Sequence, residues 1–165
     1  MTRTARLAGL LYGTAAAAYV LDRASKLWAE DALAGGPPVD VIPRVLRLTY
    51  TTNSGGAFGL GQSAPWLFAG ATILVAGIIL VASVHLTRPT VAVALGLVLG
   101  GALGNLTDRA VNGAGLSGRV TDFIDLHVWP VFNVADMAIV SGALLLAFAT
   151  VLHGEPDERE RRGAA

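Results

Sequence analysis

Two aspartates in this chain stand where a carboxylate is costly. Asp136 lies near the start of an apolar run that extends from Val131 to Leu152, and Asp122 lies just upstream of that run. A carboxylate at membrane depth is unfavourable by a few kcal/mol, so it persists only with a partner, with water or with a function. Two carboxyl groups placed close together cannot both ionise easily and therefore share a proton. One can then act as a base on water while the other acts as an acid, which is the chemistry of an aspartic peptidase.

Two functions other than a peptidase are weighed against the same residues. Proton movement by membrane carboxylates would make the chain a small proton-coupled transporter, and this stays open as an alternative. A transporter needs a continuous polar path, and toward the termini the second and fourth apolar runs offer only Ser83, His85, Ser141 and Thr150. A non-enzymatic assembly factor is favoured by the glycine-rich stretch alone, and it leaves Asp122 and Asp136 unexplained.

The residue types exclude several kinds of site. The chain has no cysteine, which excludes a disulfide, a thiol nucleophile and a thiolate metal site. It contains no His-Glu-x-x-His pattern of a zinc peptidase. No serine has a matching histidine and acid in an obvious arrangement. We therefore expect neither a metal ion nor a cofactor.

The composition is that of a membrane protein. Of 165 residues, 53% are hydrophobic and 15% are charged, whereas a soluble domain usually carries about 25% charged residues. The uncharged residues are concentrated in long stretches, which indicates membrane-spanning segments. Twelve basic and twelve acidic side chains cancel, so the net charge gives no reason to expect a nucleic-acid partner.

Four apolar segments are candidates for membrane-spanning helices. A spanning helix needs about 20 predominantly apolar residues. The second and fourth segments meet that length, and the first and third meet it by using polar ends. The chain is predicted to be an all-α polytopic membrane protein, a single domain over residues 1–165, with spans at about 7–26, 64–86, 91–108 and 131–152.

Two long connections join these spans, at about 27–63 and 109–130. The first contains Val39–Pro43 and Val45–Thr51, which are β-branched and partly alternating and predict a small sheet at the membrane surface. The second is expected to form a loop or helix segment. Because a tight turn joins the second and third spans, both connections lie on one side and both termini on the other. Each side carries six basic residues, so the positive-inside rule does not decide the orientation.

Two pairs of candidate residues precede the second span, Asp22 with Lys26 and Asn53 with Gly55. Asp22 and Lys26 are four residues apart with the acid first, the favourable order for a helical ion pair. An interfacial salt bridge explains them as well as a role in holding a substrate or a lipid headgroup. Asn53 and Gly55 follow the expected strand. They fit either a flexible loop or a backbone segment that pairs with an extended peptide.

The third and fourth spans carry the remaining polar candidates. Asn105 and Arg109 are four residues apart and share a helix face, and Asn133 and Asp136 are three apart and are neighbours. A buried asparagine at a helix end is often only a contact between helices, yet these residues lie on the same side as both aspartates. The small-residue spacing of the glycines within 96–104 predicts close helix packing.

Five motifs together resemble the lipoprotein signal peptidase, or signal peptidase II, family. They follow in the family's order over nearly the whole chain, and the length and four-helix layout agree. The motifs are Asp22-Arg23-Ala24-Ser25-Lys26, Asn53-Ser54-Gly55-Gly56-Ala57-Phe58, Gly101-Ala102-Leu103-Gly104-Asn105-Leu106-Thr107-Asp108-Arg109, Val120-Thr121-Asp122-Phe123 and Phe132-Asn133-Val134-Ala135-Asp136.

The resemblance implies an intramembrane aspartic endopeptidase of the bacterial cytoplasmic membrane. Its substrates would be diacylglyceryl-modified prolipoproteins, cut just before the lipidated cysteine. The termini would be cytoplasmic and the active site near the outer face. Membrane lipid and the prolipoproteins are the expected partners, and a monomer is expected. Asp122 and Asp136 match the catalytic dyad, and the other motif positions are Asp22, Lys26, Asn53, Gly55, Gly101, Asn105, Arg109 and Asn133.

Overall fold

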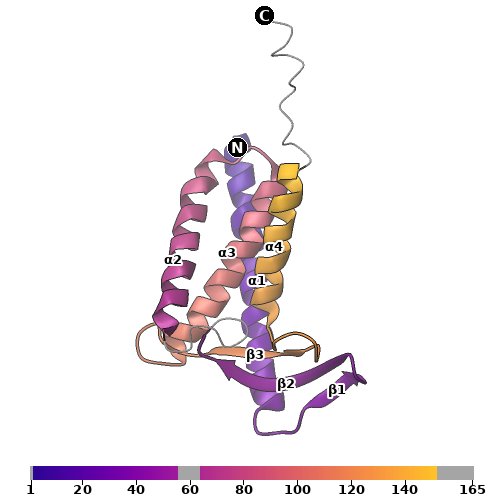
Figure 1. Ribbon diagram of the computed structural model, residues 1–165. Coiled ribbons are helices and arrows are strands. Elements are labelled where there is room, and N and C mark those ends of the chain that lie inside the picture. The colour runs from indigo at the N-terminus through magenta and orange to yellow at the C-terminus, as the bar shows by residue number, and fades with distance from the viewer. Residues whose placement is uncertain (1, 56–63, 152–165) are drawn as a thin grey trace, which may run out of the picture.

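A computed structural model describes residues 2–55 and 64–151 of the chain. In this part, four long α-helices pack side by side, and a small antiparallel sheet lies across one end of the bundle (Figure 1). The N-terminus lies at the opposite end (Figure 1). The helices are α1 (Arg3–Leu33), α2 (Pro65–Ala82) continued by the short helix η2 (Ser83–His85), α3 (Pro89–Val111) and α4 (Val134–Val151).

Local sequence signals account for where the helices begin. The Thr2 hydroxyl accepts a hydrogen bond from the Ala5 N–H and caps α1. Proline stands in the first turn of α2 and of α3, where its missing N–H and fixed φ cost nothing. Only Leu86–Arg88 separates η2 from α3, which confirms the tight turn between the second and third spans.

Three of the helices are long and apolar enough to cross a membrane. Within the described residues these are Trp66–His85, Pro89–Val111 and Val134–Val151, and the protein is a multi-pass membrane protein. α1 is not in this set. It is longer than the expected first span, and its second half carries Asp22, Arg23 and Lys26.

The two long connections meet in one sheet. The first forms a hairpin of β1 (Val39–Ile42) and β2 (Leu46–Asn53), and the second contributes β3 (Val120–Asp125). The order is β1-β2-β3 with every pair antiparallel, and Thr51 stands opposite Asp122. The small sheet predicted from the sequence is therefore present. Its third strand comes from a connection that was expected to hold a loop or helix segment.

α3 is the central helix, and glycines allow its neighbours to approach closely. A Cβ on Gly96 would lie 2.5 Å from the Leu11 carbonyl oxygen of α1. A Cβ on Gly104 would collide with the Asp22 carboxylate, also on α1. The close packing predicted from the glycine spacing is therefore confirmed.

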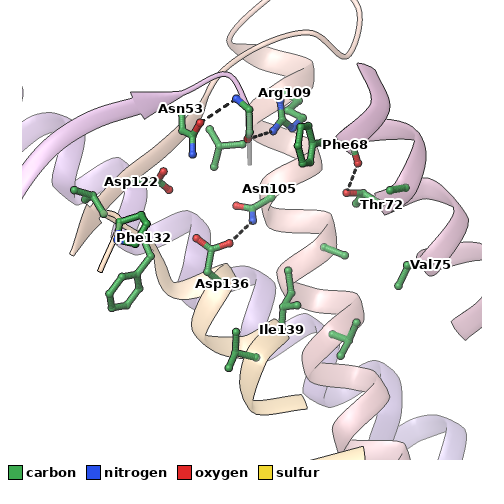
Figure 2. Close-up of a pocket in the computed structure, with 18 of the residues that line it drawn as sticks. Asn53, Phe68, Thr72, Val75, Asn105, Arg109, Asp122, Phe132, Asp136 and Ile139 are labelled. Carbon is green, nitrogen blue, oxygen red and sulfur yellow. Dashed lines mark hydrogen bonds between the residues drawn. The ribbon is translucent and has the colours of Figure 1, made fainter. Parts of the chain in front are cut away.

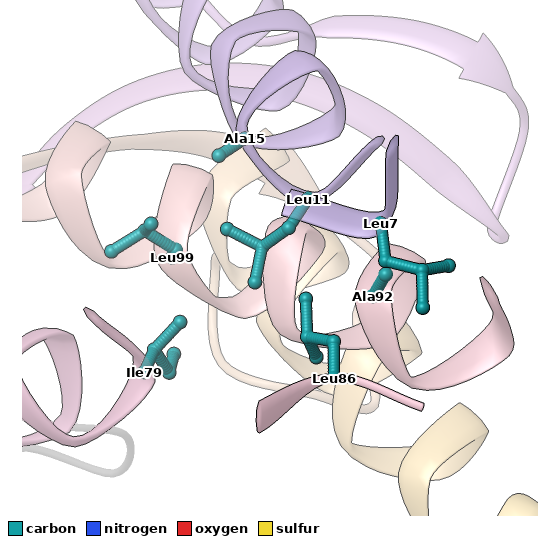
Figure 3. Packing of buried hydrophobic residues seen from close by; sticks show 7 residues of the cluster. All are labelled: Leu7, Leu11, Ala15, Ile79, Leu86, Ala92 and Leu99. Carbon is teal, nitrogen blue, oxygen red and sulfur yellow. The ribbon is translucent and has the colours of Figure 1, made fainter. Parts of the chain in front are cut away.

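Two apolar clusters hold the bundle and the sheet. The larger lies toward the end opposite the sheet and joins α1, α2 and α3 (Figure 3); its buried members are Leu7, Leu11, Ala15, Ile79, Leu86, Ala92 and Leu99. The smaller packs the end of α1 under the sheet through Ala29, Leu33 and Phe123. The Trp28 ring meets Phe123 edge to face, with 6.2 Å between centroids. These contacts attach the strand that carries Asp122 to the longest helix.

Candidate active site

The start of α4 determines how the Asp136 carboxylate is directed. The Asn133 side-chain oxygen accepts the Asp136 N–H at 3.0 Å, and the Asp136 Oδ2 accepts the Asn133 N–H at 3.3 Å. This reciprocal pair is a capping box at the helix N-terminus. The three-residue spacing seen in the sequence therefore both begins the helix and orients the carboxylate.

Asp122 faces the same site from strand β3, and its side chain is 3% exposed. The Asn133 Nδ2 donates to Asp122 Oδ1 at 2.6 Å and to the Thr121 carbonyl at 3.2 Å. A side-chain hydrogen bond from Asn53 also reaches Asp122. Asn133 thus contacts both carboxyl groups, and both carboxyl groups line one pocket (Figure 2).

Asn105 of α3 completes the immediate surroundings of Asp136. Its Nδ2 donates to Asp136 Oδ1 at 2.9 Å (Figure 2). Its Oδ1 accepts from Lys26 Nζ at 2.8 Å and from Asn133 Nδ2 at 3.2 Å. Because an ammonium group only donates, Lys26 determines which end of the Asn105 amide is turned toward Asp136.

Lys26 lies in a buried charge cluster behind the two carboxyl groups. Its Nζ is 2.9 Å from Asp22 Oδ2 and 2.9 Å from Asp108 Oδ2, and Arg23 pairs with the other oxygen of Asp108. The Asp22 Oδ1 accepts the Ala135 N–H at 2.8 Å, so α1 helps to cap α4. The predicted i,i+4 ion pair of Asp22 and Lys26 is present. Both side chains are buried inside the protein, whereas a salt bridge at the membrane interface would be exposed.

Asp108 is the residue that the sequence interpretation missed. Beside Arg109 near a helix end it has the sequence position of an ordinary surface charge, yet it is 1% exposed and bonds to α1 and to β3. The only local signal was its position between Asn105 and Arg109, three and one residues away.

Arg109 connects the two loops beside the pocket. Its guanidinium donates to the carbonyls of Ser54, Gly55 and Gly118 at 3.0–3.2 Å and lies 5.6 Å from the Phe68 ring centroid. The Gly55 N–H donates in turn to Asn53 Oδ1 at 2.9 Å. Arg109 therefore links the end of β2, the approach to β3 and the start of α2. The rest of the Asn53–Phe58 motif, residues 56–58, lies outside the described residues.

The predicted residues divide into those that line the pocket and those behind it. Three lie behind the pocket, namely Asp22, Lys26 and Asn133. Gly101 also lies outside the pocket and permits close contact between α3 and α4, because a Cβ at that position would meet the Ala135 carbonyl. The six that line the pocket are Asn53, Gly55, Asn105, Arg109, Asp122 and Asp136.

The pocket lies between the sheet and helices α2, α3 and α4 and has a volume of about 440 Å³. One end is polar and holds the two carboxyl groups. Away from them the lining is apolar and includes Val75 of α2 and Ile139 of α4 (Figure 2). Val98 and Ala102 of α3 and Phe68 of α2 also line the pocket. Such a cavity suits a peptide segment with apolar side chains and a polar backbone.

The two acidic side chains of β3 have opposite electrostatic surroundings. Burial raises the pKa of Asp122 to about 7, and the Asp136 carboxylate adds to the rise. Asp125 accepts the His127 N–H at 2.7 Å and the Arg47 Nε at 2.7 Å. The His127 N–H and then Arg47 hold the pKa of Asp125 below its usual range. Asp122 is therefore able to keep a proton near neutral pH, whereas Asp125 is ionised.

Metal ligands are not gathered at this site. Over residues 2–55 and 64–151, no group of three or more histidine, aspartate or glutamate side chains has the arrangement of a metal-binding cluster.

Comparison with known proteins gives a consistent family. Residues 14–152 match the family model for signal peptidase (SPase) II. The lipoprotein signal peptidase of Moorella thermoacetica is 43% identical over 142 residues, which cover 85% of this chain and 91% of that protein. The lipoprotein signal peptidase of Mycobacterium avium is 39% identical over 165 residues, which cover 99% of this chain and 90% of that protein.

Two solved structures share the fold. One bacterial membrane enzyme, determined by the in meso method, superposes with a TM-score of 0.80 at 26% identity, covering 90% of this chain and 92% of that one. A second bacterial membrane enzyme, determined by the same method, superposes with a TM-score of 0.73 at 28% identity, covering 86% and 92%.

Proposed function

The chain belongs to the signal peptidase II family, and on that premise we propose that it is an intramembrane aspartic endopeptidase acting on prolipoproteins. It removes the signal peptide from diacylglyceryl-modified substrates and cuts just before the lipidated cysteine. The observation that supports the aspartic mechanism is that two carboxyl groups, Asp122 and Asp136, line one pocket and both accept hydrogen bonds from Asn133. Asp122 accepts from the side-chain Nδ2 of Asn133, and Asp136 accepts from its backbone N–H.

The dyad holds one proton between its two carboxyl groups. The ionised carboxylate takes a proton from water as the water oxygen attacks the scissile carbonyl carbon, and the protonated carboxyl gives its proton to the carbonyl oxygen. When the tetrahedral intermediate collapses, the C–N bond breaks and a proton passes to the leaving amine. The dyad then again holds one proton. A pKa of about 7 for Asp122 suits this sharing at neutral pH.

The pocket accommodates an unwound substrate. A helical signal peptide buries its carbonyls in internal hydrogen bonds, so the segment at the scissile bond must be extended. The apolar wall of α2, α3 and α4 receives the signal-peptide side, and the Asn53–Gly55 segment and Arg109 border the polar end. The lipid on the substrate cysteine, held in the membrane, sets the depth of the bond to be cut.

Topology follows from the same proposal. The termini are cytoplasmic, the sheet and the dyad lie near the outer face of the cytoplasmic membrane, and α1 is the fourth span. The contacts of α1 support that role, because it packs against α3 from Leu11, beside Gly96, to Asp22, beside Gly104. The described residues of the pocket all come from one chain, and we expect the monomer to be active.

The supporting residues have positioning roles in this proposal. Asn105 and Asn133 orient the carboxyl groups, and Asp22 and Lys26 hold α1 against α3 and α4. Arg109, Asn53 and Gly55 shape the loop beside the scissile bond. Gly101 keeps α3 close to α4.

The decisive experiment is cleavage of a diacylglyceryl-modified prolipoprotein by purified protein in detergent. We expect a cut immediately before the lipidated cysteine, lost in Asp136→Asn and in Asp122→Asn while both variants stay folded. The unlipidated substrate should not be cut. Full activity of either variant would refute the dyad, and no cleavage by folded wild-type protein would refute the proposed function.

A further inference from the structure

Asp108 is a buried carboxylate that the proposed chemistry does not use. It lies near the end of α3, one residue before Arg109, and it does not line the pocket. Its Oδ1 pairs with Arg23, and its Oδ2 accepts from Lys26 Nζ at 2.9 Å. A buried ion pair is weak evidence of a purely stabilising role, since desolvation offsets much of the attraction. Its remaining hydrogen bond is therefore the informative one.

That remaining bond joins Asp108 to the backbone beside Asp122. The Thr121 N–H donates to Asp108 Oδ2 at 3.1 Å, and the Thr121 carbonyl accepts from Asn133 Nδ2 at 3.2 Å. β3 is the last strand in the sheet order, with β2 on its other side. The N–H and carbonyl of Thr121 are thus held from the bundle side, where Asp108 and Asn133 stand in place of a further strand.

Fixing Thr121 fixes Asp122. The two residues share a planar peptide unit, which leaves few ways for the Asp122 Cα to move when Thr121 is held on both its N–H and its carbonyl. The Asn133 Nδ2 that holds the Thr121 carbonyl also donates to Asp122 Oδ1 at 2.6 Å. The Asp108 carboxylate holds the N–H side.

Asp108 is also connected to the other carboxyl group. Lys26, which pairs with Asp108, donates to Asn105 Oδ1, and the Asn105 Nδ2 donates to Asp136 Oδ1. The Asp108–Lys26 pair therefore touches the supports of both Asp122 and Asp136. Displacement of this pair would alter the distance between the two carboxyl groups.

We propose that Asp108 is a positioning residue for the dyad: by holding the Thr121 N–H from α3, with Lys26 as its counter-ion, it places the Asp122 carboxyl opposite Asp136. The proposal rests on the proposed function, since it gives Asp108 a part in the same site. It predicts that Asp108 affects the rate of bond cleavage more than substrate binding, because Asp108 itself lies outside the pocket.

The test compares two substitutions that separate the hydrogen bond from the charge. Asp108→Ala removes the acceptor, and we expect kcat to fall about 100-fold, the size that small misplacements of catalytic groups produce, with KM changed by less than about threefold. Asp108→Asn keeps an oxygen for the Thr121 N–H and should restore kcat to within about tenfold of wild type.

A matched control comes from another ion pair of the sheet, between Asp125 of β3 and Arg47 of β2. Arg47→Gln removes the pair of Arg47 with Asp125, three residues beyond Asp122, and should leave kcat near the wild-type value. Amide hydrogen exchange of Thr121 supplies a readout that does not depend on cleavage. Exchange should accelerate in Asp108→Ala and stay slow in Asp108→Asn, and the Val120 and Asp122 amides should remain protected in both.

The outcomes distinguish failure of the positioning role from failure of the proposed function. A wild-type kcat in folded Asp108→Ala, or a loss of kcat in Asp108→Asn while Thr121 stays protected, would overturn the positioning role. If Asp108→Ala does not fold, Asp108→Asn alone still decides, because kcat and Thr121 protection must change together. If wild-type protein cleaves nothing, the proposed function fails, while the exchange measurement still tests the Asp108–Thr121 contact.

Discussion

One amide accounts for much of the geometry at the residue scale. Asn133 caps α4 with its side-chain oxygen and contacts Asp122 with its nitrogen. An asparagine fits because it has an acceptor and a donor at the two ends of one planar group. Serine or aspartate would also cap the helix, but neither has a nitrogen donor for Asp122. Asparagine at position 133 therefore serves both to begin α4 and to hold the Asp122 carboxyl group.

The buried Asp122 carboxyl predicts a particular pH dependence of stability. The pKa of Asp122 is about 7 in the folded protein and about 3.9 in an unfolded chain. Between these values the folded state binds more protons, so stability must fall as the pH rises from about 4 to about 7 and then level off. Thermal unfolding in detergent across this range should show that slope, and Asp122→Asn should reduce it.

Asp125 provides the contrast for this measurement. Its pKa is held below the usual range, so its contribution is present above about pH 4 and is lost as the pH falls through the folded pKa. Asp125→Asn should therefore keep the slope between pH 4 and 7. Equal slopes in wild type, Asp122→Asn and Asp125→Asn would contradict the assignment of that slope to Asp122.

At the scale of elements, α3 decides how the helices are spaced. It carries Asn105, Asp108 and Arg109 toward the site, and its glycines set the distances to α1 and α4. Small residues are the usual means of close helix contact in membranes, where no hydrophobic force drives helices together. The polar contacts at one end of α3 therefore depend on the glycines that let α1 and α4 approach it.

Replacing one of these glycines should separate the helices. In Gly96→Ala the new Cβ would lie 2.5 Å from the Leu11 carbonyl oxygen and 2.8 Å from Thr14 Cβ, and we expect a loss of about 1–3 kcal/mol from overpacking. Gly77→Ala on α2 is the matched control, since no other atom would lie within 4 Å of the new Cβ. Thermal unfolding should show a lower Tm for Gly96→Ala alone, and an equal Tm in both variants would contradict this account.

At the scale of the whole molecule, the sheet closes one end of the bundle with strands from both long connections. β2 and β3 are about 70 residues apart in the chain, and β3 brings Asp122 to α4 and α3. The Arg3 guanidinium donates to the Thr87 carbonyl at 3.1 Å at the other end. The molecule thus has one end that holds the pocket and an opposite end where the N-terminal part of α1 and the α2–α3 turn meet.

Labelling of single cysteines tests the proposed orientation and the span of α1, because the natural chain has no cysteine. In right-side-out vesicles, Arg44→Cys in the β1–β2 turn should react with a membrane-impermeant maleimide. Thr4→Cys in α1 and Thr87→Cys before α3 should react only after the vesicles are opened. Reaction of Thr4→Cys in sealed vesicles would mean that α1 does not cross the membrane.

The local features were predictable from the sequence because they depend on short-range rules. Apolar length predicted the helices that are long enough to cross a membrane, and small-residue spacing predicted the close contacts of α3. The spacing of Asn133 and Asp136 predicted neighbours, since residues three apart share a helix face. The pairing of Asp22 with Lys26 was found in the same way. A β-branched, partly alternating pattern predicted a small sheet from the first connection, whose two strands are adjacent in the chain.

Contacts between distant segments were decided by the tertiary structure alone. The Asp108–Thr121 bond, the Asp22–Ala135 bond and the β2–β3 pairing join residues whose proximity no local pattern records. The sequence analysis therefore assigned no role to Asp108, which is buried and bonded to both α1 and β3 in the fold. The residue types that could do chemistry were evident from composition and spacing, but the packing of α1, α3 and β3 determined which of them meet.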